Sequence, residues 1–198
     1  MLAAVVVGIV GGTAFGPGRA PLSGIFSPPA EAPRASAPRG PPAGFVAFRD
    51  ELFSIAHPPS FARRQSRDPE IQLLATTRDS TASFLVRAVQ VGFEIESANL
   101  EAAKRLTDRV VTSGKRVKLL APPQRSDLGG LPGFFYLYTF KDADTGRRGA
   151  HSHYFLFKGD TMITIVFQAL PADRLPLYGP LFDRIARTFR PAPGPPSP

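Results

Sequence analysis

Residues 134–169, FFYLYTFKDADTGRRGAHSHYFLFKGDTMITIVFQA, carry most of the information on the fold. Three runs in this stretch, 134–140, 149–157 and 161–169, are rich in aromatic and β-branched residues, which favour strands. Two turn signals separate the runs: DADTG at 142–146 and the pair Gly159-Asp160. Short turns of Gly and Asp between strands are typical of hairpins. We therefore expect two consecutive hairpins at the core of an antiparallel sheet.

The length of the second turn determines which residues face each other. A two-residue turn at Gly159-Asp160 places His153 opposite Val166. The same register puts five apolar side chains on one face: Tyr154, Leu156, Ile163, Ile165 and Phe167. A three-residue turn would instead place the histidines of this strand beside Ile165 and Phe167.

The rest of the domain alternates strand and helix signals. Further strands are expected at 45–48, 52–57, 71–77, 82–91 and 117–121. Apolar residues then recur at helical spacing in two places. The first helix is expected at 99–113, with an apolar stripe of Leu100, Ala103, Leu106 and Val110, an N-cap at Ser97 or Asn99, and Gly114 past its end. The second, with a stripe from Leu177 to Phe189, should be regular from about Pro180.

These elements predict an α+β fold in one domain, residues 44–190. The sheet should be antiparallel, with about seven or eight strands packed between helices. Pro-rich residues 27–43 are expected to be a linker, because so few apolar side chains cannot offset the entropy of ordering. Fully extended, that linker would reach about 50 Å. Residues 191–198, PAPGPPSP, are expected to be a disordered tail.

Residues 1–26 are expected to be a signal segment or a membrane anchor. They open with MLAAVVVGIVGGTAF, and Arg19 is the first charged residue. Fifteen helical residues span roughly 22 Å, less than the roughly 30 Å of a bilayer core. The basic start of a secretory signal is missing. An apolar N-terminus packed on the domain, or a start site further upstream, is therefore the alternative interpretation.

Three short motifs resemble the PsbP/DcrB-like domain family. The first is FRDELFSIAHPPSF at 48–61, which resembles the opening strand, turn and second strand of that family. The second is the turn Gly130-Leu131-Pro132-Gly133 before a long aromatic strand. The third is YGPLFDRIARTF at 178–189, which resembles the last helix with its closing Ile, Thr and Phe.

The resemblance implies a PsbP-like α/β/α sandwich and a non-catalytic adaptor or binding module. The family includes a photosystem subunit, periplasmic lipoproteins and secretion-associated chaperones, and it implies no shared catalytic residues and no cofactor. The chain has no cysteine. It therefore lacks the lipidated Cys of the lipoprotein members, and disulfides and thiolate metal sites are excluded.

The best candidate for chemistry is the pair His151 and His153. Residues two apart on a strand face the same side, so both imidazoles could approach one metal ion. A metal-dependent hydrolase that uses this pair, with His57 as the third histidine of the chain, is the alternative function. The simpler interpretation is that both histidines are surface or half-buried side chains. The DADTG turn lacks the later acidic ligands of a calcium loop, so a plain hairpin turn is expected there.

Charge suggests a binding surface. The chain has a formal net charge of +8, and six basic residues cluster around the first helix: Lys104, Arg105, Arg109, Lys115, Arg116 and Lys118. This cluster is the candidate contact with an anionic membrane surface or an acidic protein partner. An ordinary solvated helix face, basic near its C-terminal end, is the simpler explanation. No nucleic-acid partner is expected, because the aromatic residues follow core periodicity, and nothing in the sequence indicates an oligomeric state. We expect a membrane-tethered or exported binding or assembly module on the extracytoplasmic side, with an unknown partner.

Overall fold

The computed structural model describes residues 40–193 except 97, 114–115 and 144. The expected anchor at 1–26 and residues 27–39 of the expected linker lie outside this part of the chain. No helix within it is long and apolar enough to cross a membrane. The described elements are β1 (Val46–Arg49), β2 (Phe53–His57), β3 (Ala62–Arg64), β4 (Ile71–Thr76), β5 (Ala82–Ile95), α1 (Leu100–Thr112), β6 (Lys118–Leu119), β7 (Gln124–Leu128), β8 (Leu131–Lys141), β9 (Arg148–Ala169), the 3-10 turn η1 (Ala172–Arg174), α2 (Leu175–Ala186) and β10 (Arg190–Pro191).

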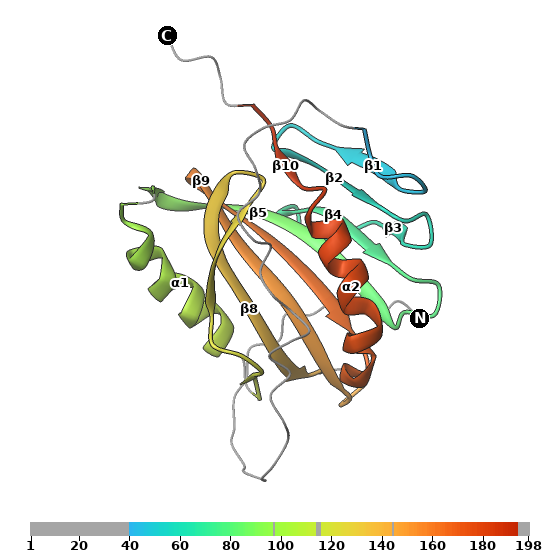
Figure 1. The fold of residues 1–198 in the computed structure, drawn as a ribbon. Helices are drawn as coiled ribbons and strands as arrows, with labels where there is room; N and C mark the ends of the chain where they lie inside the picture. The colour runs from blue at the N-terminus through green and yellow to red at the C-terminus, as the bar shows by residue number, and fades with distance from the viewer. Residues whose placement is uncertain (1–39, 97, 114–115, 144, 194–198) are drawn as a thin grey trace.

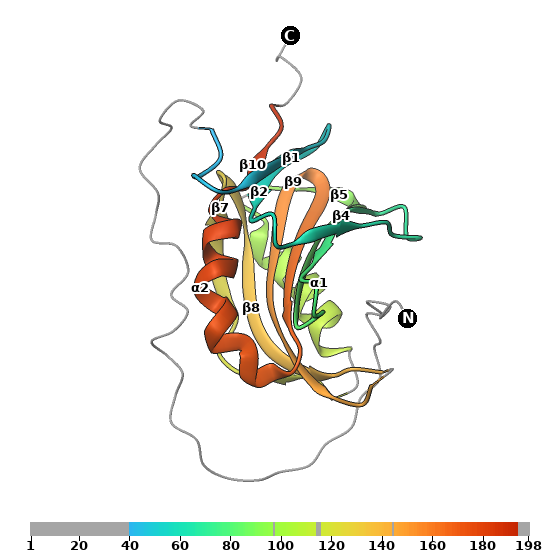
Figure 2. The same ribbon diagram turned by 90° about the vertical axis from the view of Figure 1, so that its right-hand side faces the viewer.

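The strands form two antiparallel sheets. In the described residues, the larger sheet has seven strands in the order β3-β4-β5-β9-β8-β6, with β7 also paired to β8. The smaller sheet has the order β1-β2-β10. Figure 1 shows β8, β9 and β5 crossing the centre of the molecule, and Figure 2 shows α1 and α2 on opposite sides of β8 and β9. The expected α+β class and antiparallel sheet are confirmed.

β9 folds back on itself. Its residues 148–156 pair with β8, and its residues 159–169 pair with β5. His151 Nε2 lies 2.9 Å from Gln168 Oε1 although the two residues are 17 positions apart. A straight strand of that length would separate them by about 56 Å. β9 therefore contains the second of the two expected hairpins (Figure 2).

The turn of this hairpin lies at Gly159-Asp160, as expected. Gly159 has a φ of 59°, which the first central residue of a two-residue II′ turn requires. A register that places His153 opposite Val166 also places His151 opposite Gln168, and these two side chains are in contact. One core cluster contains the apolar residues expected to share a face, namely Tyr154, Leu156, Ile163, Ile165 and Phe167. The three-residue alternative is therefore wrong.

A strand that the sequence did not predict, β7, precedes the aromatic strand. β7 pairs with the start of β8, from Gln124 opposite Phe135 to Leu128 opposite Leu131. The expected turn at Gly130 to Gly133 is thus only partly right, because Gly129 and Gly130 connect the strands and Gly133 lies within β8. A Cβ atom on Gly133 would meet the backbone oxygen of Phe155 at 1.9 Å. Glycine is needed there for the close approach of β8 and β9.

α1 forms within one residue of the expected range at each end. Its buried residues are Leu100, Ala103, Thr107 and Val111, whereas Leu106 and Val110 are half-buried. The buried stripe therefore includes a threonine that the sequence did not predict. Asn99 occupies the N-cap position without a side-chain cap to the helix. The candidate residues Ser97 and Gly114 lie outside the described residues.

α2 begins at Leu175, directly after η1, so its regular part starts five residues before the expected position at Pro180. Pro176 lies in the first turn, where its missing N–H costs no helical hydrogen bond. Pro180 lies inside the helix, where its missing N–H removes one helical hydrogen bond. Burial of the apolar face of α2, which includes Phe182 and Ile185, offsets this loss. Leu177 was expected in that face but is 63% exposed, so it is not part of the core.

Thr188 joins the end of α2 to the smaller sheet. The backbone N–H of Ala56 donates to Thr188 Oγ1 at 2.8 Å, and Thr188 Oγ1 donates to the carbonyl of Ile185 at 2.6 Å. The neighbouring Phe189 is buried and stacks on Phe53 at 5.8 Å between ring centroids. The first and last family-like motifs therefore contact each other through a hydrogen bond and an aromatic pair.

The described chain continues three residues beyond the expected domain boundary at Arg190, into the expected tail. Arg190 and Pro191 form β10, which pairs with Ser54 and Phe53 of β2. The N–H of Ala192 then donates to the carbonyl of Leu52 at 2.8 Å. Residues 194–198 of the expected tail lie outside the described residues.

Candidate functional site

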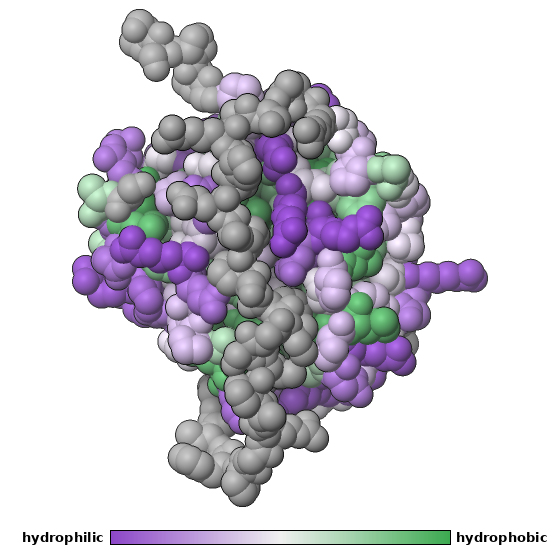
Figure 3. Space-filling view, viewed as in Figure 1, coloured by the Kyte–Doolittle hydropathy of each residue, from purple (hydrophilic) through white to green (hydrophobic). Residues whose placement is uncertain are grey.

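Two arginines form the exposed basic face of α1. Arg105 and Arg109 are both exposed, and residues four apart lie on the same face of a helix. Figure 3 shows hydrophilic residues gathered on the side of the molecule where Figure 1 places α1. The cationic face is therefore presented to solvent, with the apolar face of α1 on the sheet.

The two carboxylates of α1 are already paired with other basic residues. Glu101 Oε1 lies 2.5 Å from Arg125 Nη2 on β7, and Asp108 Oδ2 lies 2.6 Å from Lys104 Nζ. Within the described residues, neither Arg105 nor Arg109 has an ion pair. The positive charge of this pair of arginines is therefore not compensated by the acidic residues of the same helix.

Lys104 pairs with Asp108, and this carboxylate also binds the sheet, which the sequence did not reveal. Tyr136 Oη donates to Asp108 Oδ1 at 2.7 Å, and Thr107 Oγ1 lies 2.6 Å from the same hydroxyl. Burial opposes ionisation of Asp108, but hydrogen bonds from Lys104 and Tyr136 outweigh it and lower the pKa of this carboxyl. Lys104 is half-buried in this network, so we omit it from the proposed contact surface.

The remaining candidates follow the C-terminal end of α1. Arg116 and Lys118 are exposed, and Lys118 opens β6, where it pairs with Thr139 of β8. The next residue, Leu119, is 38% exposed. Lys115 lies outside the described residues. We use the term basic surface for Arg105, Arg109, Arg116 and Lys118.

A second basic group lies at the other edge of the larger sheet. Arg63 and Arg64 belong to the edge strand β3, and Arg67 follows it; all three are exposed. The guanidinium of Arg63 lies over the ring of Phe48, 4.6 Å from its centroid. This group is therefore separate from the basic surface.

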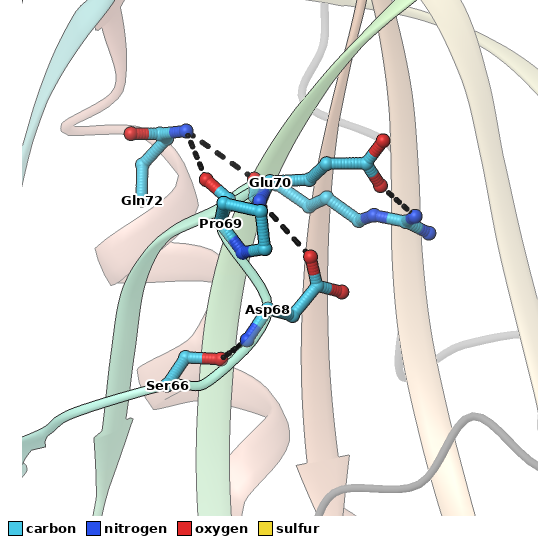
Figure 4. A network of polar contacts seen from close by, with 6 residues as sticks. Ser66, Asp68, Pro69, Glu70 and Gln72 are labelled. Atoms are coloured by element: carbon cyan, nitrogen blue, oxygen red, sulfur yellow. Dashed lines mark hydrogen bonds and ion pairs between the residues drawn. The ribbon is translucent and has the colours of Figure 1, made fainter.

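The loop after β3 is held by its own polar contacts, as Figure 4 shows. The N–H of Asp68 donates to Ser66 Oγ at 3.0 Å, and the N–H of Glu70 donates to Asp68 Oδ1 at 2.9 Å. Gln72 Nε2 donates to the carbonyl of Pro69 at 3.2 Å, and the Glu70 carboxylate pairs with Arg87 on β5. These contacts fix the shape of the loop and account for its carboxylates, so the loop supplies no separate site.

His151 and His153 are both buried, each 7% exposed, and not at the surface or half-buried as expected. The residue that joins them is Tyr138, which pairs with His151 across β8 and β9. Tyr138 Oη lies 3.2 Å from Nδ1 of His151 and 3.1 Å from Nδ1 of His153. Gln168 completes the group through Nε2 of His151. We call these four residues the histidine cluster.

The hydroxyl of Tyr138 can donate to only one of the two imidazoles. With His151 Nε2–H donating to Gln168, its Nδ1 accepts from Tyr138, and Nδ1–H of His153 donates to Tyr138. Nε2 of His153 then has no partner and is buried. Burial lowers the pKa of His151 to about 4, although the hydrogen bond to Gln168 opposes this shift. Burial and the neighbouring His151 lower the pKa of His153 as well.

The third histidine of the chain lies on the opposite face of the sheet. His57 packs against Phe84, with ring centroids 5.4 Å apart, and Phe84 belongs to the core on the α2 side. His153 stacks on Phe155, which belongs to the cluster on the α1 side. Among the described residues, no three His, Cys, Asp or Glu side chains are grouped to hold a metal ion. The sheet therefore separates His57 from the pair that the hydrolase alternative requires.

The DADTG turn is a hairpin turn, as expected. Asp142 Oδ1 accepts from the N–H of Thr145 at 2.8 Å and from its hydroxyl at 2.6 Å. The N–H of Gly146 donates to the carbonyl of Asp142 at 3.0 Å. The carboxylate of Asp142 thus closes the turn through local hydrogen bonds.

The fold is PsbP-like, which confirms the resemblance seen in the sequence. No family model and no curated protein matches the sequence. The solution structure of cyanobacterial PsbP (CyanoP) from Synechocystis sp. PCC 6803 is similar, with a TM-score of 0.56 and 15% identity over 81% of this chain and 99% of that chain. The Ran-binding protein Mog1p of Saccharomyces cerevisiae has a TM-score of 0.50 and 15% identity over 74% of this chain and 95% of that chain.

Proposed function

We propose that this chain is a non-catalytic binding or assembly module, tethered to a membrane or exported, whose basic surface contacts an anionic membrane. The observation that carries the proposal is the pair Arg105 and Arg109, exposed on one helix face while both carboxylates of α1 are paired elsewhere. Arg116 and Lys118 extend the same charge beyond the helix. Each basic residue near an anionic surface contributes about 1 kcal/mol.

The fold supports a protein partner in general terms. Mog1p, which shares the fold, is a Ran-binding protein, and PsbP shares the fold as well. We propose that this domain likewise binds a protein, on the extracytoplasmic side of the membrane. The apolar residues 1–26 would supply the signal or anchor, and residues 27–43 the connection to the domain.

The proposed topology predicts the result of a reporter fusion. A reporter that is active only in the periplasm, fused after Pro198 and expressed in bacteria, should be active, because the domain would follow residues 1–26 across the membrane. Deleting residues 1–26 should leave a soluble domain and an inactive reporter. A reporter of the opposite kind, active only in the cytoplasm, serves as the control, and its activity with the full chain would contradict the exported topology.

The proposed contact predicts the effect of charge reversal. Changing Arg105 and Arg109 to Glu, in a chain that lacks residues 1–26, should weaken binding to vesicles containing anionic phospholipid by at least about 30-fold. The loss of two attractive charges of about 1 kcal/mol each accounts for this factor, and the repulsion of the two added carboxylates increases it. Co-sedimentation with the vesicles measures the effect, and wild-type binding should fade as salt is added.

The matched control is the double change of Arg64 and Arg67 to Glu. It alters the net charge equally but lies at the opposite edge of the sheet, so we expect binding near the wild-type level. Equal losses in both variants would show that net charge, and not the basic surface, drives the association. Melting temperatures should stay close to that of the wild type, because all four arginines are exposed.

A further inference from the structure

A bulge near the end of β5 carries an exposed aromatic ring. The pairing of β5 with β9 is regular up to Gln90 and resumes at Ile95. Between these positions four residues of β5, 91–94, lie opposite one residue of β9, Asp160. A bulge redirects the side chains that it contains, and Phe93 within it is 45% exposed. The ring is therefore presented at the surface, where the core does not use it.

Three carboxylates accompany this ring. Glu94, Glu96 and Asp160 are all exposed, and within the described residues none of them has an ion pair. Lys158, the basic residue before the turn of β9, donates instead to the carbonyl of Ala192 at 2.9 Å. The negative charge at this end of the sheet is therefore not compensated. We use the term bulge surface for Phe93, Glu94, Glu96 and Asp160.

Asn99 holds the backbone of the bulge surface in place. Its Oδ1 accepts from the N–H of Glu96 at 2.8 Å, and its Nδ2 donates to the carbonyl of Glu94 at 2.8 Å. Both carboxylates therefore project from a backbone that is already fixed. A fixed surface loses less conformational entropy when a partner binds.

The exposed face of α2 has the opposite charge. Its members follow one another at spacings of three and four residues, which places them on one side of the helix, and all are exposed. We call them the α2 stripe: Leu177, Pro180, Arg184 and Arg187. In Figure 3, hydrophobic and hydrophilic residues lie next to each other where Figure 1 places α2. Neither arginine has an ion pair within the part of the chain that the structure describes.

The carboxylates near α2 do not use these arginines. Asp183 is half-buried, and burial raises the pKa of its carboxyl although Arg187 opposes the shift. Asp173 precedes the helix, in η1. The guanidinium of Arg184 lies 5.1 Å from the ring centroid of Phe45, which restricts its position. The two arginines of the α2 stripe therefore remain free to bind carboxylates of another molecule.

The bulge surface and the α2 stripe are complementary. Each combines an apolar side chain with at least two charges, negative on one surface and positive on the other. Guanidinium groups bind carboxylates through two parallel hydrogen bonds, and Phe and Arg are enriched at protein interfaces. Figure 1 shows the end of β5 and the turn of β9 on the side of the molecule away from α2. The two surfaces of one copy therefore do not meet, whereas those of two copies can.

We propose that the chain binds a second copy of itself, with the bulge surface of one copy on the α2 stripe of the next. Phe93 packs on Leu177 and Pro180 of the neighbouring copy. Arg184 and Arg187 of that copy bind the carboxylates of the bulge surface. Because two different surfaces meet, the contact can repeat along a row of copies. The inference does not rest on the proposed membrane contact, because neither surface includes a residue of the basic surface.

Sedimentation velocity tests the proposal on the full chain, kept in solution with mild detergent in which micelles outnumber protein molecules. The mean protein mass per particle should rise with protein concentration, because each added copy offers a new surface. Added salt should reverse the rise, since the contact depends on exposed charges. A mass that stays at one copy over the whole concentration range would overturn the proposal.

Two charge reversals make the test specific. Arg184→Glu with Arg187→Glu reverses the charge of the α2 stripe, and Glu94→Arg with Glu96→Arg reverses that of the bulge surface. Each double variant should need at least about tenfold more protein to reach the wild-type mass, because attraction becomes repulsion. Association of either variant at the wild-type concentration would overturn the proposal.

The matched control is the change of Arg64 and Arg67 to Glu at the edge of the sheet formed by β3. It alters the net charge as much as the reversal of the α2 stripe does, and it should leave the association at the wild-type level. An equal loss in this control would show that net charge, and not the α2 stripe, drives the association, which would overturn the proposal.

A mixture of the two charge-reversal variants is the sharpest comparison. The reversed α2 stripe of one fits the reversed bulge surface of the other, and their unchanged surfaces also fit each other. The mixture should therefore associate at close to the wild-type concentration. Each double reversal changes the formal net charge of +8 by four, to +4 and +12, so overall charge still repels the two proteins. Recovery would also show that both variants are folded, and a mixture as dissociated as its components would overturn the proposal.

Discussion

Replacing Phe182 by Ala should lower the free energy of unfolding by about 3 to 5 kcal/mol, the usual cost of truncating a buried Phe. Phe182 is 1% exposed, and its ring stacks on Phe167 of β9 at 5.0 Å and on Tyr178 of α2 at 5.8 Å between centroids. The cavity left behind would lie between α2 and the sheet. Urea denaturation monitored by circular dichroism measures the change.

Leu177→Ala is the matched control on the same helix. This side chain is 63% exposed, so its truncation should change the free energy of unfolding by no more than about 0.5 kcal/mol. A Phe182→Ala variant that unfolds at the wild-type urea concentration would contradict the packing of α2 on the sheet. A large loss in the Leu177 variant would contradict the observed orientation of the helix.

Mild acid should destabilise the protein through the histidine cluster. The pKa of His151 is lowered to about 4 by burial, against about 6.5 in an unfolded chain. Below pH 6.5 the unfolded chain therefore binds protons that the folded chain does not, and stability falls with pH until about pH 4. The loss from His151 alone is about 3 kcal/mol at pH 4. The lowered pKa of His153 adds a loss of the same sign.

The double variant His151→Gln and His153→Gln isolates this effect. Glutamine keeps hydrogen-bonding groups near Tyr138 but does not titrate. Carboxyl groups such as Asp108, whose pKa is lowered by hydrogen bonds that outweigh burial, titrate in both proteins and cancel in the comparison. Urea denaturation at pH 7, 5.5 and 4.5 should show that the free energy of unfolding falls more on acidification in the wild type than in the double variant. Parallel pH profiles would contradict the neutral, buried state of the pair.

Much of the fold could be predicted from the sequence, because the strong signals are local. The runs at 134–140 and 161–169 contain enough aromatic and β-branched residues to form strands in almost any surrounding. Gly159 predicted its turn, and the helical spacing from Leu100 predicted α1. Weak segments were missed: Gln124–Leu128 has four consecutive polar residues before Leu128 and forms β7 only because the edge of β8 is available to pair with it.

The candidate site could be predicted only in part. The exposure of Arg105 and Arg109 follows from helical spacing, since the apolar residues of α1 occupy the other face. The role of Lys104 could not be predicted, because Tyr136 reaches Asp108 from a strand that lies 28 positions away. Tyr138 was a missed partner of the histidines, because the expected turn at 142–146 would have placed Leu137 opposite His151, whereas the observed loop between Lys141 and Arg148 places Tyr138 there.

Local sequence alone determined the strongly patterned strands, the two helices and the two hairpin turns, because backbone preference and side-chain periodicity act over a few residues. It also determined the net positive charge and the absence of cysteine chemistry. Only the tertiary structure decided which charges remain exposed and which histidines are buried. Those properties depend on contacts between strands and helices that are distant in the chain, where the register of pairing and the packing of each face determine a side chain's neighbours.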